Sequence, residues 1–174
     1  MTVRIEELSV SIAEYLDEHF FGKYRGTVDT IGSGNELGLI KAKVPEVLGS
    51  ELTHWARPAV PFAGKQHGFL ALPEVGDGVW IEFEAGKIDL PIWSGCWWAD
   101  GEIPSPGAEK TRVFATSKGH KIVLDDDKNE VRIEHGGGPS IVLTDSAITL
   151  EAKGKKIEIT SSSVSLNSGA LEVS

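Results

Sequence analysis

One small pattern, repeated seven times between residues 121 and 174, constrains the fold more than any other feature of the sequence. Each repeat is an apolar residue, any residue, and a second apolar residue. Side chains two positions apart on a strand point to the same face, so each repeat predicts a very short strand with one apolar face. The seven pairs are Ile122/Leu124, Val131/Ile133, Ile141/Leu143, Ile148/Leu150, Ile157/Ile159, Val164/Leu166 and Leu171/Val173.

The spacing of these pairs indicates strands that alternate with tight turns. Successive pairs begin seven to ten residues apart, and the spacers are rich in Gly, Ser, Asp, Asn and Lys. Two inward side chains bury little surface, and residues 115–174 contain no Phe, Tyr or Trp to fill a globular core. The stripe therefore needs covering neighbours. Three arrangements would supply them: a single-chain β-solenoid, an antiparallel meander packed on the preceding domain, or several chains wound together. The regularity of the repeats to the last residue favours several chains wound together.

Composition places a globular core in the first part of the chain only. The 174 residues are 40% hydrophobic, and the aromatic residues end at Phe114. No apolar run is long enough to cross a membrane, and Glu6 and Glu7 stand where a signal peptide would be apolar. We therefore expect synthesis in the cytoplasm without a signal peptide. The net charge of -9 has no basic segment to offset it, so no nucleic-acid partner is expected.

The N-terminal residues 1–21 are predicted to contain an amphipathic helix. Ile5, Leu8, Ile12, Leu16 and their neighbours recur at steps of three and four residues over positions 4–20, and the other face is acidic. Two uses of the apolar face are equally compatible with the sequence. The helix either packs on its own domain or docks on a neighbouring protein.

Residues 22–98 are predicted to form a small closed β-barrel. Strands are expected near residues 23–31, 37–44, 53–59, 69–72, 79–84 and 91–97, with turns rich in Gly, Pro and Asp between them. Residues 99–112 contain Pro104, Pro106 and Gly107 without apolar periodicity, which is typical of a linker. Residues 113–174 then form the repeating stalk. The fold class is all-β, with one N-terminal helix.

Three stretches of the barrel carry a resemblance to a known family. They are residues 54–64 (HWARPAVPFAG), 72–83 (LPEVGDGVWIEF) and 89–95 (DLPIWSG), followed by residues 117–126 (SKGHKIVLDD) at the start of the stalk. In this order they resemble the OB-fold domain and the following trimeric β-helix of central spike proteins of contractile injection systems. That family includes the phage baseplate protein V group and the VgrG proteins of type VI secretion.

The resemblance implies a homotrimeric spike in the baseplate of a phage tail-like or injection particle. Its OB barrels would sit on a separate hub protein, and its intertwined β-helix would touch the target membrane only transiently, during puncture. The fourteen paired residues would then form the trimer interface. Ile5, Leu8, Ile12 and Leu16 would be candidates for contact with the hub, and Leu171, Val173 and Ser174 for contact with a PAAR-type tip protein.

Chemical motifs give little support to catalysis, and no cofactor or metal is expected. Asp125, Asp127 and Asn129 begin a calcium-loop pattern, but Glu130 replaces its glycine. Cys96, between Trp93 and Trp97, is interpreted as a small core residue rather than a nucleophile. The main alternative function is an OB-fold binding module for single-stranded nucleic acid or saccharide, with the tryptophans as stacking platforms. An enzyme using Cys96 is the remaining alternative.

Overall fold

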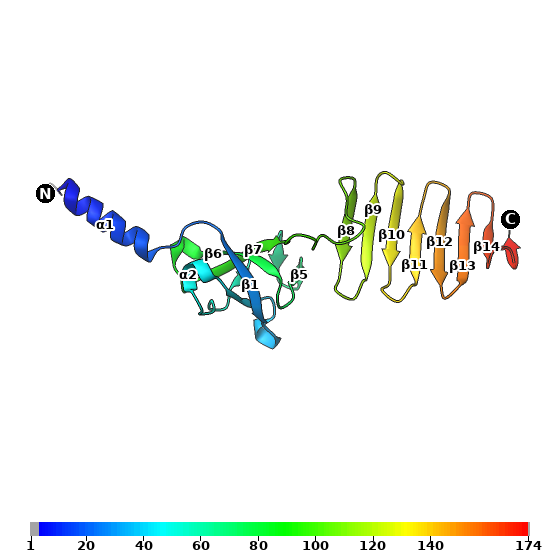
Figure 1. Cartoon of the computed structure of the whole chain (residues 1–174). Helices are drawn as coiled ribbons and strands as arrows, with labels where there is room; N and C mark the ends of the chain where they lie inside the picture. The colour runs from blue at the N-terminus through cyan, green and yellow to red at the C-terminus, as the bar shows by residue number, and fades with distance from the viewer. Residues whose placement is uncertain (1–3, 174) are drawn as a thin grey trace. The chain divides into compact units, whose positions relative to one another are not determined.

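The computed structural model describes residues 4–173, which fall into two compact units that divide between Gly101 and Glu102. The first unit contains a helix and a small barrel, and the second is one antiparallel sheet (Figure 1). Strands dominate both units, so the all-β prediction is confirmed. No helix within the described residues is long and apolar enough to span a membrane.

The predicted N-terminal helix is present as α1 (Ile5–Glu18). The Arg4 backbone N–H donates to the Glu7 side chain at its start (3.3 Å). Directly after the helix the chain is fixed to the barrel, because the Phe20 N–H donates to the Gly86 carbonyl (2.8 Å) and the Phe20 ring packs against Tyr24 and Phe83. The apolar side chains of α1 itself are exposed, so the helix does not pack on its own domain.

The barrel is a five-stranded sheet that curls back on itself. Its strand order is β2-β1-β6-β7-β3, antiparallel except for the β3–β7 pair. Ile40 and Ala56 exchange backbone hydrogen bonds of 3.2 and 2.8 Å, which return the β3 end of the sheet to β2. This arrangement is an OB-fold. The strands are β1 (Tyr24–Ile31), β2 (Ile40–Lys43), β3 (Arg57–Pro58), β6 (Gly78–Phe83) and β7 (Pro91–Trp97).

Alternating residues of these strands fill the barrel interior. β1, β2, β6 and β7 each send side chains inward at alternate positions, as strands with one buried face do. The Trp93 ring is buried, and its indole N–H donates to the Gly38 carbonyl (3.1 Å). The buried apolar residues of the barrel are Val28, Ile40, Ala42, Val44, Ala56, Val79, Ile81, Phe83 and Trp93.

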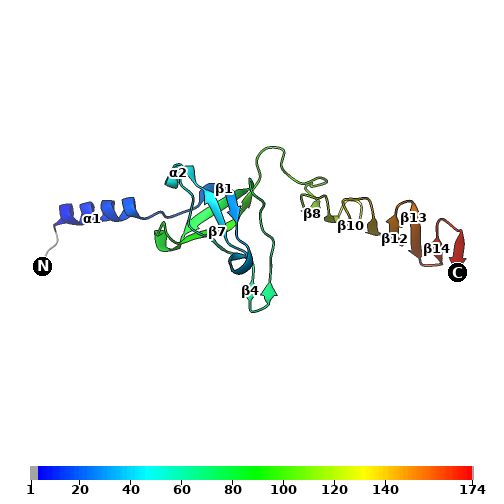
Figure 2. The same ribbon diagram turned by 90° about the horizontal axis from the view of Figure 1, so that it is seen from below.

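Two connections of the barrel differ from the predictions. Residues 69–72 do not form a strand; β4 (Ala63–Gly64) and β5 (His67–Gly68) pair instead, in a hairpin that projects from the barrel (Figure 2). An apolar run becomes a strand only where a partner edge is free, and β7 already pairs with β3 and β6. The turn expected at residues 45–49 is a short helix, α2 (Pro45–Leu48). Proline fits its first position, and Gly49 follows it with a φ of 58°. Two 3₁₀ turns, η1 (Gly34–Glu36) and η2 (Glu84–Gly86), complete the unit.

The second unit is an eight-stranded antiparallel meander. Every strand pairs with its neighbours in sequence, in the order β8 to β15 (Figure 1). Each of the seven predicted pairs lies in one strand, and β8 adds an eighth strand before them. One continuous sheet excludes the single-chain solenoid, whose strands would form coils. The strands are β8 (Thr111–Ala115), β9 (Lys121–Asp125), β10 (Glu130–Glu134), β11 (Ser140–Leu143), β12 (Ala147–Ala152), β13 (Lys155–Thr160), β14 (Val164–Leu166) and β15 (Leu171–Val173).

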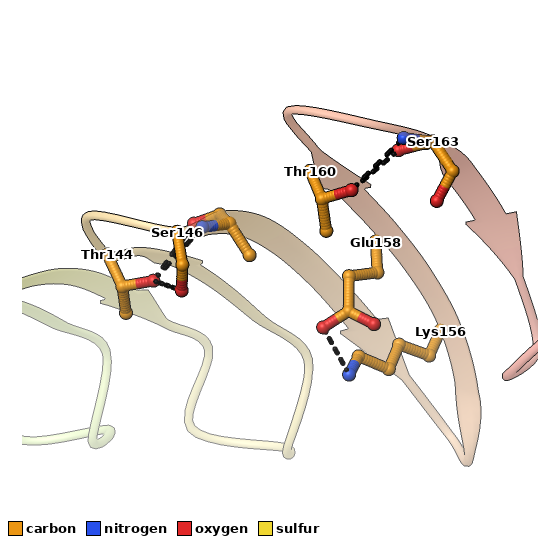
Figure 3. Close-up of polar contacts among 7 residues, drawn as sticks. Thr144, Ser146, Lys156, Glu158, Thr160 and Ser163 are labelled. Atoms are coloured by element: carbon orange, nitrogen blue, oxygen red, sulfur yellow. Dashed lines mark hydrogen bonds and ion pairs between the residues drawn. The ribbon is translucent and has the colours of Figure 1, made fainter. Parts of the chain in front are cut away.

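Alternate turns of this meander use one hydrogen-bonding scheme. The Thr144 hydroxyl accepts from the Ala147 N–H (3.2 Å), and the Thr160 hydroxyl accepts from the Ser163 N–H (3.1 Å) (Figure 3). Asp125 has the same role in the β9–β10 turn, where its carboxylate accepts from the Lys128 N–H (3.1 Å). That hydrogen bond is the main reason why the pKa of Asp125 lies below its usual range. A polar side chain at the last residue of a strand, or directly after it, thus fixes these three turns.

Candidate assembly face of the C-terminal sheet

The strand register gathers the fourteen predicted residues on one face of the sheet. Directly opposed residues on neighbouring strands share a face, so each strand contributes one residue to each of two continuous rows. The first row is Leu124, Val131, Leu143, Ile148, Ile159, Val164 and Val173. The second row is Ile122, Ile133, Ile141, Leu150, Ile157, Leu166 and Leu171.

Phe114 extends the second row onto β8, which the prediction of seven pairs omitted. It lies opposite Ile122, and its ring is exposed. Arg112 occupies the equivalent place in the first row, opposite Leu124. Because Arg112 is polar, β8 lacks the pair of apolar residues by which the other seven strands were predicted. Phe114, two positions later, is the one sequence signal that could have identified β8 as a further strand of this face.

This apolar face is uncovered in the single chain. Thirteen of the fourteen side chains are between 37% and 65% exposed, and only Leu166 is more buried. The face is hollowed into a groove that runs from β8 to β14. Monomeric proteins rarely leave a contiguous apolar surface of this extent in water. The two rows therefore require covering by another chain.

The opposite face of the same sheet is mainly polar, apart from a few valines such as the buried Val123, and its charged side chains pair with one another. Arg132 lies between Glu130 and Glu134, with ion pairs of 3.0 and 3.1 Å, the first of which lacks hydrogen-bond geometry. Lys156 and Glu158 form a further pair at 3.0 Å (Figure 3). Pairs between residues two apart on one strand leave the other face untouched. The sheet consequently has one face suited to solvent and one suited to association.

The far edge of the sheet is β15, which pairs with β14 on one side only. Leu171 and Val173, two of the predicted tip contacts, are exposed on this strand. The third, Ser174, lies outside the described residues. An edge strand offers unpaired backbone groups to a partner.

Cys96 is exposed at the barrel surface, so its interpretation as a core residue was wrong. It lies near the end of β7, past an irregularity in the β6–β7 register that interrupts the alternation between Trp93 and Cys96. Although the residue is exposed, neighbouring atoms keep part of the surrounding water from its thiol; this desolvation raises the pKa of the thiol, and the Asp77 carboxylate adds to the shift. A nucleophilic cysteine needs a lowered pKa, so this environment works against the enzyme alternative. Within residues 4–173, no three His, Cys, Asp or Glu side chains cluster as metal ligands.

Three tryptophan rings of the barrel, those of Trp55, Trp80 and Trp97, already lie against cations of the same chain, while Trp98 is 65% exposed. The Arg25 guanidinium lies 5.6 Å from the Trp80 ring centre and 5.3 Å from that of Trp97. Lys41 lies 5.0 Å from the Trp55 ring centre. These cation–π contacts occupy surfaces that a base or sugar would need. They weigh against the alternative of a stacking platform for nucleic acid or saccharide.

Two family models match the two units separately. The model of the type VI secretion system/phage-baseplate injector OB domain matches residues 24–98. The model of the phage baseplate V C-terminal trimerisation domain matches residues 111–172, which contain every residue of the two apolar rows except Val173. The resemblance stated from the sequence is thereby confirmed.

A curated relative matches across half of the chain. It is the "Actin cross-linking toxin VgrG1" of Vibrio cholerae serotype O1, 32% identical over 81 residues. The match spans 47% of this chain but only 6% of the relative, so the toxin activity in its name is not transferred. The chain therefore belongs to the family of VgrG-like baseplate spike proteins, as its OB barrel, its trimerisation domain and this relative together show.

Proposed function

We propose that the protein is a structural, membrane-piercing spike at the centre of the baseplate of a contractile injection system. The observation that carries this proposal is the two-row apolar face, exposed on a domain that matches a trimerisation model. Three copies would each supply one side of a prism, with the rows meeting on its axis. Such an intertwined β-helix would bury the apolar face. Burial of apolar surface stabilises the assembly by about 25 cal/mol per Å².

The geometry of the sheet gives this stalk its mechanical role. If each strand runs across the prism, eight strands separated by about 4.8 Å give a stalk of about 34 Å. Its outer surface is the charged face with Arg132 and Lys156. Bending the stalk would require breaking many backbone hydrogen bonds at once, because neighbouring strands are paired along their length. Stiffness along the axis is what a piercing element needs.

Two partners follow from the ends of such a spike. The OB barrels would seat on a hub protein of the baseplate. The opposite end, where β15 offers Leu171 and Val173, would hold a tip protein of the PAAR type. The target membrane would be a transient contact during puncture, and the chain itself would have no catalytic role.

The test uses two neighbouring residues that lie on opposite faces of β12. Leu150→Asp places three carboxylates on the axis of the proposed prism, whereas Thr149→Asp places them on its outer face. We expect the wild-type chain and Thr149→Asp to have a mass of about 56 kDa by light scattering, three times 18.7 kDa. Leu150→Asp should be monomeric. A Leu150→Asp chain that still forms a trimer of normal thermal stability would refute an axial position for this face.

A further inference from the structure

The uncovered face of α1 has a spacing that is more specific than amphipathic character alone. Within the helix, Ile5, Leu8, Ile12 and Tyr15 follow one another at steps of three, four and three residues, and His19, the next position of the series, lies just past the end of the helix. This is the a/d pattern of a coiled coil, over two heptads. The stripe is exposed in the single chain, from 84% at Ile5 to 49% at Ile12. No part of the described barrel covers it.

The residues beside and behind this stripe are arranged for contact with copies of the same helix. Ser9 and Ser11 flank the stripe, and their hydroxyls donate to the Ile5 and Leu8 carbonyls of their own helix (2.9 and 3.1 Å). Glu7 and Glu14 occupy heptad position c and Asp17 position f, all on the outer side of the helix, away from the stripe. Acidic helices can therefore approach one another along this seam while most of their charge stays in solvent. The acidic residue that does flank the stripe, Glu18, is the last residue of the helix, so repulsion between neighbouring helices is confined to that end.

We propose that the three α1 helices of the trimer pack against one another as a parallel coiled coil, with Ile5, Leu8 and Ile12 in its core. The inference rests on the proposed trimer, because the C-terminal domain brings the three copies together. In this arrangement Ile5, Leu8 and Ile12, which were also candidates for contact with a hub protein, contact the other two helices of the trimer. The hub would then meet the acidic outer face of the helices instead.

The connection to the barrel supports an assembly within one trimer. Phe20, two residues after the helix, is fixed to the barrel by its hydrogen bond to Gly86 and by its ring contacts. Each helix is thus tethered to its own barrel by a short segment, which raises the effective concentration of its sisters. A helix of 14 residues is marginal alone in water, and burial of the stripe would stabilise it. Two heptads are too short to hold three chains together without the stalk.

Disulfide trapping in the full chain tests this arrangement. With the native thiol removed by Cys96→Ser, a cysteine is placed either in the seam, by Ile12→Cys, or on the outer face, by Glu14→Cys. Seam residues of neighbouring coiled-coil helices approach within disulfide range, whereas outer residues do not. After mild oxidation we expect linked pairs of chains for Ile12→Cys, formed at least tenfold faster than for Glu14→Cys. Light scattering should still show a mass of about 56 kDa, so that the link lies within one trimer.

The outcomes separate this inference from the proposed function. A trimer in which Ile12→Cys links no faster than Glu14→Cys would overturn the coiled coil alone and leave the face for a hub protein. A monomeric wild-type chain would overturn the trimer and the coiled coil together. As a second readout, Ile12→Asp should reduce the helical circular dichroism while the trimer mass is unchanged. An unchanged helical signal would contradict the packing of α1 against its sisters.

Discussion

At the scale of single residues, the Thr160 hydroxyl shows how the stalk holds its register. It accepts from the backbone N–H groups of Ser162 and Ser163 (3.3 and 3.1 Å), inside a turn whose outer atoms face water. Thr160→Val keeps the shape of the side chain and removes the acceptor. We expect the free energy of unfolding to fall by about 1 kcal/mol per chain, the typical net value of one hydrogen bond. Chemical denaturation followed by far-ultraviolet circular dichroism measures it.

The control for this prediction is Thr149→Val, which makes the same change in the middle of β12 rather than in a turn. Valine suits a strand at least as well as threonine, so stability should be unchanged or slightly higher. An equal loss in both variants would show that the turn hydroxyl has no special role. Thr144→Val should repeat the effect of Thr160→Val, because its turn is built in the same way.

At the scale of elements, β8 tests whether the assembly face extends beyond the repeats found in the sequence. Phe114 is 53% exposed in the single chain, so its removal there would cost little. If two further chains cover it, Phe114→Ala should destabilise the trimer by about 3 kcal/mol per chain, as core truncations of aromatic residues do. Thermal unfolding of the trimer measures the difference. Val113→Ala on the opposite face is the matched control, and equal effects would place β8 outside the prism.

The elements predicted most accurately are those fixed by local signals. In the stalk, apolar residues two apart define each strand and polar residues define each turn, so all seven predicted pairs lie in strands. The helix α1 followed from a local periodicity in the same way. The family was also accessible from the sequence, because its motifs are short local stretches in the barrel and at the start of the stalk.

The elements predicted poorly depend on contacts that are distant in the sequence. The apolar run at residues 69–72 has the composition of a strand but no free sheet edge, and β4 and β5 pair in its place. The exposure of Cys96 depends on an irregularity in the β6–β7 register between Trp93 and Cys96, which the local sequence does not indicate. Only the register of β8 and β9 shows that Phe114 continues the apolar row. Burial and pairing partners are properties of the fold rather than of the local sequence.

At the scale of the whole molecule, the two compact units provide separate spectroscopic signals. All five tryptophans lie between Trp55 and Trp98, in the first unit, so their fluorescence reports the barrel alone. The mass in solution reports the stalk, which carries the trimerisation domain. Cooperative unfolding of each unit by itself would therefore be visible in one full-length chain.

The final prediction is that each unit can be weakened without the other. Ile81 is fully buried in the barrel, and Ile81→Ala should lower the free energy of unfolding seen by tryptophan fluorescence by about 2–5 kcal/mol, while the mass stays near 56 kDa. Leu150→Asp should do the reverse, giving a monomer whose tryptophan transition is close to that of the wild type. If Leu150→Asp also shifted the tryptophan transition strongly, the barrel would depend on the assembled stalk for its stability. A spike loaded along its axis would then fail as one cooperative body rather than at the junction of two.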